Sequence, residues 1–359
     1  MAAADLRRIL AWDRAWTHQR RAAGLGGVTA LALSGGGANG AFGAGVMVGW
    51  TRSGRRPNFD VVTGVSTGAL IAPFVFAGPD WDTRLTAAYQ DRRLGGLVSG
   101  RLSALIGPGL GALFGQSLVS AGPLIRLVED YADQALLAAI AAGHDSGRRL
   151  LVATTNLDTQ DCVLWDLGAI AKASLAPDDH GRSLDLFRTV LVASASVPGL
   201  FPPAQISFGD GLPIETHVDG CVSTPLFLAP GSMTGRRLEA CIRPAELYLI
   251  INGNLDAACR SPRRGAISTL LRAFDTMSRA GVRSAITAIE LLTHRNGAAL
   301  ACAAIRDDRP AHPFNFKAAN LRDLFELGRT EAMSGQAFRP AARGRSWRGI
   351  DPLAGAKAA

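Results

Sequence analysis

Residues 31–46 read LALSGGGANGAFGAGV, an apolar run followed by three consecutive glycines and a fourth at Gly40. Consecutive glycines indicate that a ligand or another part of the protein comes so close to the backbone that side chains would not fit. Two explanations are possible. Gly35, Gly37 and Gly40 fit the G-x-G-x-x-G spacing that binds dinucleotides. A glycine run after a strand can instead direct backbone N–H groups toward an oxyanion. The rest of the chain decides between these two explanations.

A second motif, GVSTG at residues 64–68, favours the oxyanion explanation. It follows an apolar β run at 59–63 and precedes an apolar helical run at 69–76. This strand–turn–helix setting is typical of a nucleophile elbow, whose strained turn needs small neighbours and holds a serine at a helix N-terminus. We therefore predict that Ser66 is a nucleophile and that Gly64 and Gly68 keep its turn compact.

The dinucleotide explanation requires an acidic residue that the chain does not supply. That residue should lie about 20 positions on, at the end of the second strand, where it binds ribose. Asp60 has roughly this separation, but it lies at the start of its strand, whereas Gly64 stands at the end. We therefore predict that backbone N–H groups around Gly35, Gly36 and Gly37 form an oxyanion hole.

The base that would activate Ser66 is not an obvious histidine. Four histidines after Ser66 lie in polar turns or beside charged neighbours, as expected of exposed structural residues: His144, His180, His294 and His312. The sequence HVDG at 217–220 offers a different candidate, Asp219, which ends an extended run and is followed by a glycine. His217 lies two residues before it and shares its face of an extended strand, so His217 is an alternative base.

Taken together, SGGGANG, GVSTG and the DG after a β run resemble the patatin-like phospholipase family. The resemblance extends from about Ala30 to about Gly328. It implies an α/β fold with a central sheet between helices, and a Ser–Asp dyad that works without a histidine. Three further stretches are similar to bacterial members: ATTNLDTQDCVLWDLGAIA, LVASASVPGLFPP and FNFKAANLRDLFELG.

The resemblance carries family roles onto matching residues only. It implies that Ser66 is the nucleophile, that Asp219 is the base and that Gly35–Gly37 form the oxyanion hole, with Gly40, Gly64, Gly68 and Gly220 supporting the motifs. Because it falls on the DG pair, we prefer Asp219 to His217 as the base. We expect His217 to pack or hydrogen-bond on its strand.

Two positions depart from the family pattern. Asn39 stands where many relatives have Arg or Lys, and a missing cation would weaken contacts to an anionic head group or an oxyanion. Cys221 follows Gly220 where relatives have Gly or Ala, and its small side chain should keep the turn. We expect the proline-rich VPGLFPP at 197–203 to form a rigid wall of the site.

Strands that alternate with helices along the chain predict a three-layer α/β/α sandwich with a mostly parallel or mixed central sheet. We expect a β hairpin around the polar turn at 158–161 and mainly helix at 265–333. No linker is visible, which favours one catalytic domain at 28–335. A helical extension at 1–27 would precede this domain, and a flexible tail at 336–359 would follow it.

One segment allows two interpretations. Residues 102–125 carry no charge, but glycine, proline and polar residues interrupt them, so a membrane-spanning helix is not expected. The segment is either a buried part of the core or a mobile apolar cap beside a lipid-binding mouth.

Composition excludes several function classes. The chain has 359 residues, 48% of them hydrophobic, which is enough for a sizeable core. Its five cysteines form neither a C-x-x-C pair nor a disulfide framework, and calcium-ligand and nucleic-acid-binding patterns are absent. We expect no cofactor, no metal and no nucleic-acid partner.

The net charge of +8 fits either an ordinary surface or attraction to an anionic membrane. Without a recognisable signal peptide or spanning segment, we expect a cytoplasmic protein with at most peripheral membrane contact.

These observations predict a serine acylhydrolase that cleaves lipid acyl esters of phospholipids, lysophospholipids or neutral glycerides through an acyl-enzyme. Two alternatives remain open. The same dyad can transfer the acyl group to an alcohol or a thiol instead of water, or the fold can bind lipid without catalysis. The intact serine, aspartate and glycine loop argue against the last of these.

Overall fold

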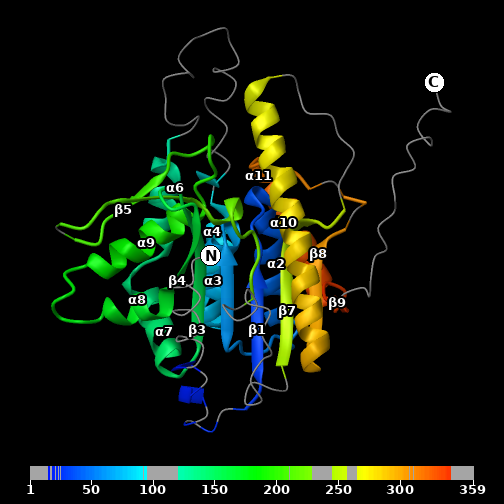
Figure 1. Ribbon diagram of the computed structural model, residues 1–359. Coiled ribbons are helices and arrows are strands. Elements are labelled where there is room, and N and C mark those ends of the chain that lie inside the picture. The colour runs from blue at the N-terminus through cyan, green and yellow to red at the C-terminus, as the bar shows by residue number, and fades with distance from the viewer. Residues whose placement is uncertain are drawn as a thin grey trace.

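The computed structural model contains one nine-stranded mixed sheet with helices on both faces (Figure 1). Its strand order is β5-β6-β3-β2-β1-β7-β8-β9, and β4 pairs with β3 beside this path. The structure describes residues 15, 16, 18–20, 22, 24, 26–91, 93–94, 120–209, 211–228, 245–256, 265–306, 308–309 and 311–340.

The centre of the sheet is parallel. Its strands are rich in Val, Leu, Ile and Ala and are buried almost throughout, as expected when helices cover both faces. They run in the order β3, β2, β1, β7 and β8, each parallel to the next. The parallel strands are β1 (Val28–Leu33), β2 (Val61–Val65), β3 (Arg149–Asn156), β7 (Ala245–Asn254) and β8 (Ala299–Ile305).

Antiparallel strands extend the sheet at both edges. β3 and β4 form the hairpin predicted around 158–161, and β6 also pairs antiparallel with β3. β5 adds to β6 on one side, and β9 adds to β8 on the other. Their bounds are β4 (Asp161–Asp166), β5 (Ala204–Ile206), β6 (Glu215–Asp219) and β9 (Arg339–Pro340). The predicted three-layer sandwich with a mixed sheet is confirmed.

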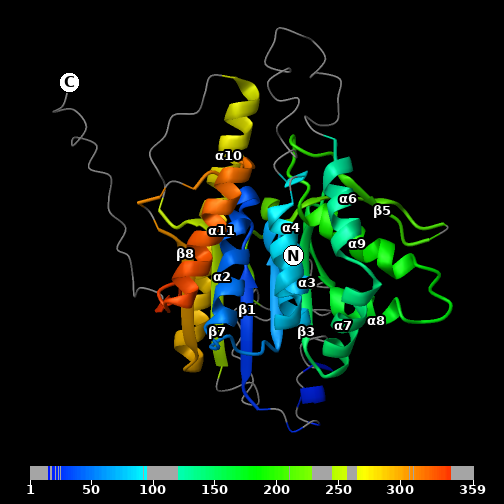
Figure 2. The same ribbon diagram turned by 180° about the vertical axis from the view of Figure 1, so that it is seen from behind.

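Most of the described helices cover one face of the sheet (Figure 2). Leu31 and Leu33 of β1 belong to the larger core on this face. Eight of the described helices contribute buried residues to this core. These are α2 (Gly40–Arg52), α3 (Thr67–Ala77), α4 (Asp82–Gln90), α6 (Gly122–Tyr131), α7 (Gln134–Asp145), α8 (Leu167–Ala173), α9 (Arg182–Ser194) and α11 (Ala318–Met333).

The long helix α10 (Ala266–Asn296) covers the opposite face. The alternate residues of β1, Ala30 and Ala32, pack there with Val282 and Ile289 of α10. Because successive side chains of a strand point to opposite faces, this short apolar run contributes residues to the hydrophobic cores on both sides of the sheet. Three short 3-10 turns complete the described elements: η1 (Gly37–Asn39), η2 (Pro79–Trp81) and η4 (Gly220–Val222).

The structure confirms one sequence prediction, with an exception, and corrects another. Residues 265–333 are mainly helical, as predicted, because α10 and α11 make up most of them. The exception is 299–305, which form β8 because pairing with β7 outweighs the helix propensity of its alanines. The predicted tail boundary at 335 is too early. Phe338 packs on Trp50 with ring centroids 4.2 Å apart, and β9 pairs with β8. The sheet therefore reaches Pro340.

Two other predictions, on the uncharged segment and on the N-terminal extension, concern residues that lie partly outside the described ranges. Residues 102–119 of the uncharged segment lie outside the described residues, and α6 begins within its last part. Of the predicted N-terminal extension, the described residues are partly helical and include the buried Trp16. The division into extension, catalytic domain and tail otherwise stays a prediction.

Candidate active site

Ser66 lies at a sharp turn between β2 and α3. Its φ of 55° is a left-handed conformation that few non-glycine residues adopt. Such strain costs on the order of 1–3 kcal/mol and must be held by surrounding contacts. One of them is Ser194, whose Oγ accepts a hydrogen bond from the Ser66 N–H at 3.0 Å and donates to the Ala153 carbonyl at 2.7 Å. The predicted elbow is therefore present.

Asp219 reaches Ser66 because two strands meet end to end on one edge of β3. The last residue of β2, Val65, pairs with Ala153 of β3. The last residue of β6, Asp219, pairs with the next residue of β3, Thr154. β4 occupies the other edge over the same residues, so β2 and β6 must share one edge. Their facing ends bring the serine and the aspartate together.

The Ser66 hydroxyl donates a hydrogen bond to Asp219 Oδ2 at 2.6 Å. The other carboxylate oxygen, Oδ1, accepts the Cys221 N–H at 2.8 Å. Ser66 is buried and Asp219 is fully buried. Burial raises the pKa of Asp219 to about 6, although hydrogen bonds from Ser66 and Cys221 lower it. The buried carboxylate is thus a stronger base than one in water.

His217 makes no such contact. Its Nδ1 lies 2.9 Å from Thr154 Oγ1, and its Nε2 lies 2.8 Å from Glu215 Oε2. Both ring nitrogens are therefore occupied away from the Ser66–Asp219 pair. The prediction that His217 packs and hydrogen-bonds on its strand is confirmed.

The glycine loop offers two free backbone donors rather than three. The Gly35 N–H donates to the Pro225 carbonyl at 3.1 Å, so this predicted oxyanion donor is already occupied. Among the described residues, no group accepts a hydrogen bond from the N–H groups of Gly36 and Gly37. Of the three predicted oxyanion-hole donors, Gly35–Gly37, only Gly36 and Gly37 therefore remain as candidates among the described residues.

The protein's own atoms press against all three glycines. A Cβ on Gly35 would lie 2.1 Å from Cys221 Sγ, and one on Gly36 would lie 2.0 Å from the Asn252 carbonyl oxygen. A Cβ on Gly37, whose φ is +55°, would lie 2.2 Å from the Pro313 carbonyl oxygen. Packing alone therefore demands glycine here, whatever ligand also approaches.

The four glycines predicted to support the motifs are equally restricted. Each packs where a Cβ would lie 2.5 Å or less from another atom, mostly backbone oxygen. The contacts are Gly40 with Thr67 Oγ1, Gly64 with the Gly68 carbonyl, Gly68 with the Leu33 carbonyl, and Gly220 with the Ala153 carbonyl.

The two departures from the family pattern are both buried. The Asn39 side chain makes no capping hydrogen bond to α2, and its Oδ1 has no hydrogen-bond partner within the described part of the chain. Cys221 lies against Gly35 next to the dyad, and burial, with the neighbouring Asp219, raises the pKa of its thiol well above the usual range. The thiol is therefore neutral and a poor nucleophile.

A largely apolar pocket opens beside Ser66 on the α3 side of the loop. It has about 930 Å³ of empty volume, part of which is open to solvent. Gly37 and Ala38 line it at the loop, and Val197, Leu200 and Phe201 confirm that VPGLFPP forms a wall. Its other walls include Leu70, Phe74, Tyr89, Leu127, Leu191 and Phe314.

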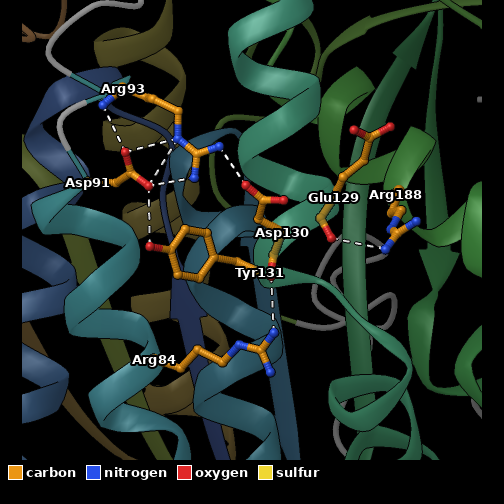
Figure 3. A network of polar contacts seen from close by, with 7 residues as sticks. All are labelled: Arg84, Asp91, Arg93, Glu129, Asp130, Tyr131 and Arg188. Atoms are coloured by element: carbon orange, nitrogen blue, oxygen red, sulfur yellow. Dashed lines mark hydrogen bonds and ion pairs between the residues drawn. The ribbon is translucent and has the colours of Figure 1, made fainter.

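Ion pairs connect the end of α4 to α6 beside this pocket (Figure 3). Arg93 binds Asp91 at 2.7 Å and Asp130 at 2.5 Å. Tyr131, whose side chain lines the pocket, donates its hydroxyl to Asp91 at 3.3 Å. Two further arginines donate to α6 carbonyls from α4 and α9: Arg84 and Arg188.

Neither a metal centre nor a membrane span is found in the part of the chain that the structure describes. That part holds no cluster of three or more His, Cys, Asp or Glu side chains placed to bind a metal ion. Its helices are all too short or too polar to cross a bilayer.

Sequence reasoning missed Ser194. A serine near the end of a helix carries no local signal, because its two partners lie 128 and 41 residues away in the chain. Its only hint was that it belongs to a stretch, LVASASVPGLFPP, that resembles bacterial family members.

Comparison with known proteins identifies the family. The model of the patatin-like phospholipase family matches residues 31–230, which is more than half of the chain. Among solved structures, VipD from Legionella pneumophila is similar with a TM-score of 0.36 and 13% identity, covering 88% of this chain and 68% of VipD. A search of curated proteins gave no match. The chain belongs to the patatin-like phospholipase family, a family of lipid acyl hydrolases.

Proposed function

We propose that this protein hydrolyses lipid acyl esters with Ser66 as nucleophile and Asp219 as general base. The observation that carries the proposal is the 2.6 Å hydrogen bond from the Ser66 hydroxyl to the buried Asp219 carboxylate, beside an apolar pocket. The strained turn at Ser66 supports it, as do the amides of Gly36 and Gly37, which have no acceptor in the part of the chain that the structure describes.

In the first half-reaction, Asp219 takes the hydroxyl proton as Ser66 Oγ attacks the ester carbonyl carbon. The carbonyl electron pair moves onto oxygen, where the N–H groups of Gly36 and Gly37 stabilise the charge. A preorganised donor of this kind contributes about 3–4 kcal/mol to the transition state. Collapse of the intermediate breaks the bond to the leaving alkoxide, which takes the proton from Asp219 and departs as an alcohol.

In the second half-reaction, Asp219 takes a proton from water, and the resulting hydroxide adds to the acyl carbonyl. Ser66 leaves with that proton, and a fatty acid is released. The acyl chain occupies the apolar pocket, since a polar chain would lose its hydration there. Apart from the ester and the water molecule, every reacting group in this scheme belongs to the chain, so the scheme uses no cofactor.

Replacing Ser66 tests the nucleophile. Ser66→Ala should abolish covalent labelling by a fluorophosphonate probe, which mass spectrometry of the wild type should locate on Ser66. It should also lower ester hydrolysis by roughly 10⁴-fold or more, because the reacting oxygen is gone. Full labelling of a folded Ser66→Ala variant contradicts the assignment. Product analysis with an added alcohol would reveal acyl transfer in place of hydrolysis.

Two isosteric changes separate the possible bases. Asp219→Asn should lower kcat by roughly 10²–10⁴-fold, because an amide cannot accept the proton. The fold should persist, since the change removes a buried charge. His217→Gln should retain most of the activity because neither ring nitrogen faces Ser66. Rates of both variants on a short soluble ester, with circular dichroism as the folding control, give the answer. The reverse order of activities favours a histidine mechanism.

The raised pKa of Asp219 predicts the pH dependence. Burial favours the protonated carboxyl, so kcat/KM should fall as pH decreases through about 6, where the base is lost. An ordinary carboxylate would keep its activity to about pH 4. The pH profile of wild-type hydrolysis, limited to the pH range in which the fold persists, measures this midpoint. A midpoint near 4 would indicate a solvated base.

A further inference from the structure

The apolar pocket beside Ser66 follows helix α3 away from the nucleophile. Ser66 is the N-cap of α3, and Leu70 and Phe74 of this helix line the pocket. At a rise of about 1.5 Å per residue, Leu70 lies about 6 Å and Phe74 about 12 Å from Ser66 along the helix axis. Leu70 is the only residue at 67–76 that is not buried. Its accessible surface therefore belongs to the pocket that it lines.

Two other helices show where the pocket stops. The end of α9 reaches the elbow through Ser194, and Leu191, about one turn before it, lines the pocket. Phe187, a further turn from the elbow, does not line the pocket and is 0% exposed. The end of α4 reaches the first residue of α3 through the Tyr89 hydroxyl, at 2.8 Å. Tyr89 lines the pocket, whereas Leu85, one turn before it, does not and is 0% exposed.

Phe74 is the deepest α3 residue that lines the pocket, and we call its side chain the floor. It is 5% exposed, and no later residue of α3, a helix described throughout, lines the pocket. Helical side chains lean toward the helix N-terminus, so the Phe74 ring covers part of the turn before its Cα. An extended alkyl chain advances by about 1.3 Å per carbon, because its C–C bonds of about 1.5 Å zigzag. At most about nine carbons therefore fit between Ser66 and the floor.

We propose that Phe74 is the specificity-determining residue for acyl length and limits the chain on Ser66 to about eight carbons. The acyl chain lies along Leu70 and ends at the floor. That the occupant is the acyl chain of an ester rests on the proposed function, whereas the length of the apolar space does not. Each CH2 that enters this space leaves water and strengthens binding. A CH2 beyond the floor must stay outside the pocket or displace a packed side chain.

A series of p-nitrophenyl esters from butanoate to hexadecanoate, used below their critical micelle concentrations, tests the length limit. For the wild type, kcat/KM should rise about threefold to fourfold per CH2 as far as the octanoate, because each buried CH2 contributes a similar gain. It should rise no further at the decanoate and the dodecanoate. A steady rise to the hexadecanoate overturns the limit.

Phe74→Ala should raise the ratio of kcat/KM for the dodecanoate over the octanoate by about tenfold or more, because it opens space for several carbons. Loss of a buried ring also destabilises the fold, but this ratio does not depend on the folded fraction. Phe76→Ala is the matched control. Phe76 belongs to the same helix, is fully buried and does not line the pocket, so its replacement should leave the ratio unchanged. Equal ratios in the two variants overturn the role of Phe74.

Leu70→Phe tests the same path from the opposite direction. Its larger side chain should shorten the apolar space and lower kcat/KM for the octanoate about tenfold relative to the butanoate. An unchanged ratio overturns the path along α3.

Alkanol binding separates this inference from the proposed function. Isothermal titration of the full-length Ser66→Ala variant with octanol and dodecanol measures the length of the pocket without any hydrolysis. The two affinities should be similar, and addition of Phe74→Ala should favour dodecanol by about tenfold or more. A Ser66→Ala variant that already prefers dodecanol by about tenfold overturns the limit. If the wild type hydrolyses no ester of the series, the proposed function fails, while the alkanol titration still decides the length of the pocket.

Discussion

The candidate active site depends on how β2 and β6 share one edge of β3. The two strands run toward each other and end at neighbouring positions, opposite Ala153 and Thr154. A register slip of one residue in β6 would turn Asp219 to the other face of the sheet and remove it from Ser66. Packing of Gly220 against the Ala153 carbonyl and the bond from the Cys221 N–H to Asp219 fix the end of β6.

The glycine loop combines a structural and a chemical role. Cys221, Asn252 and Pro313 approach it so closely that packing alone excludes side chains from Gly35, Gly36 and Gly37. The Pro225 carbonyl accepts the hydrogen bond of the Gly35 amide, whereas the amides of Gly36 and Gly37 have no acceptor among the described residues. A loop held this rigidly keeps its donors in position before any substrate binds, which is the condition for electrostatic stabilisation of an oxyanion.

Local signals in the sequence predicted the elbow at Ser66, the hairpin around 158–161 and the mixed sandwich, because each depends on neighbouring residues. Features set by distant contacts were not predictable. Ser194 stabilises the elbow from a helix far along the chain, and the Gly35 amide is occupied by Pro225. The alanine-rich β8 has the composition of a helix, and only pairing with β7 makes it a strand. The choice of Asp219 over His217 rested on a family resemblance, because in sequence both residues lie on one strand face.

The most direct test of the Ser66–Asp219 dyad is an infrared titration of the Asp219 carboxyl, obtained as the difference between wild type and Asp219→Asn. We predict a midpoint at about pH 6, because burial outweighs the hydrogen bonds that favour the carboxylate. In a Ser66→Ala background the midpoint should rise further, since the serine hydroxyl stabilises the charged form. A midpoint that does not move when Ser66 is replaced would show that the two side chains share no hydrogen bond, and would contradict the proposed dyad.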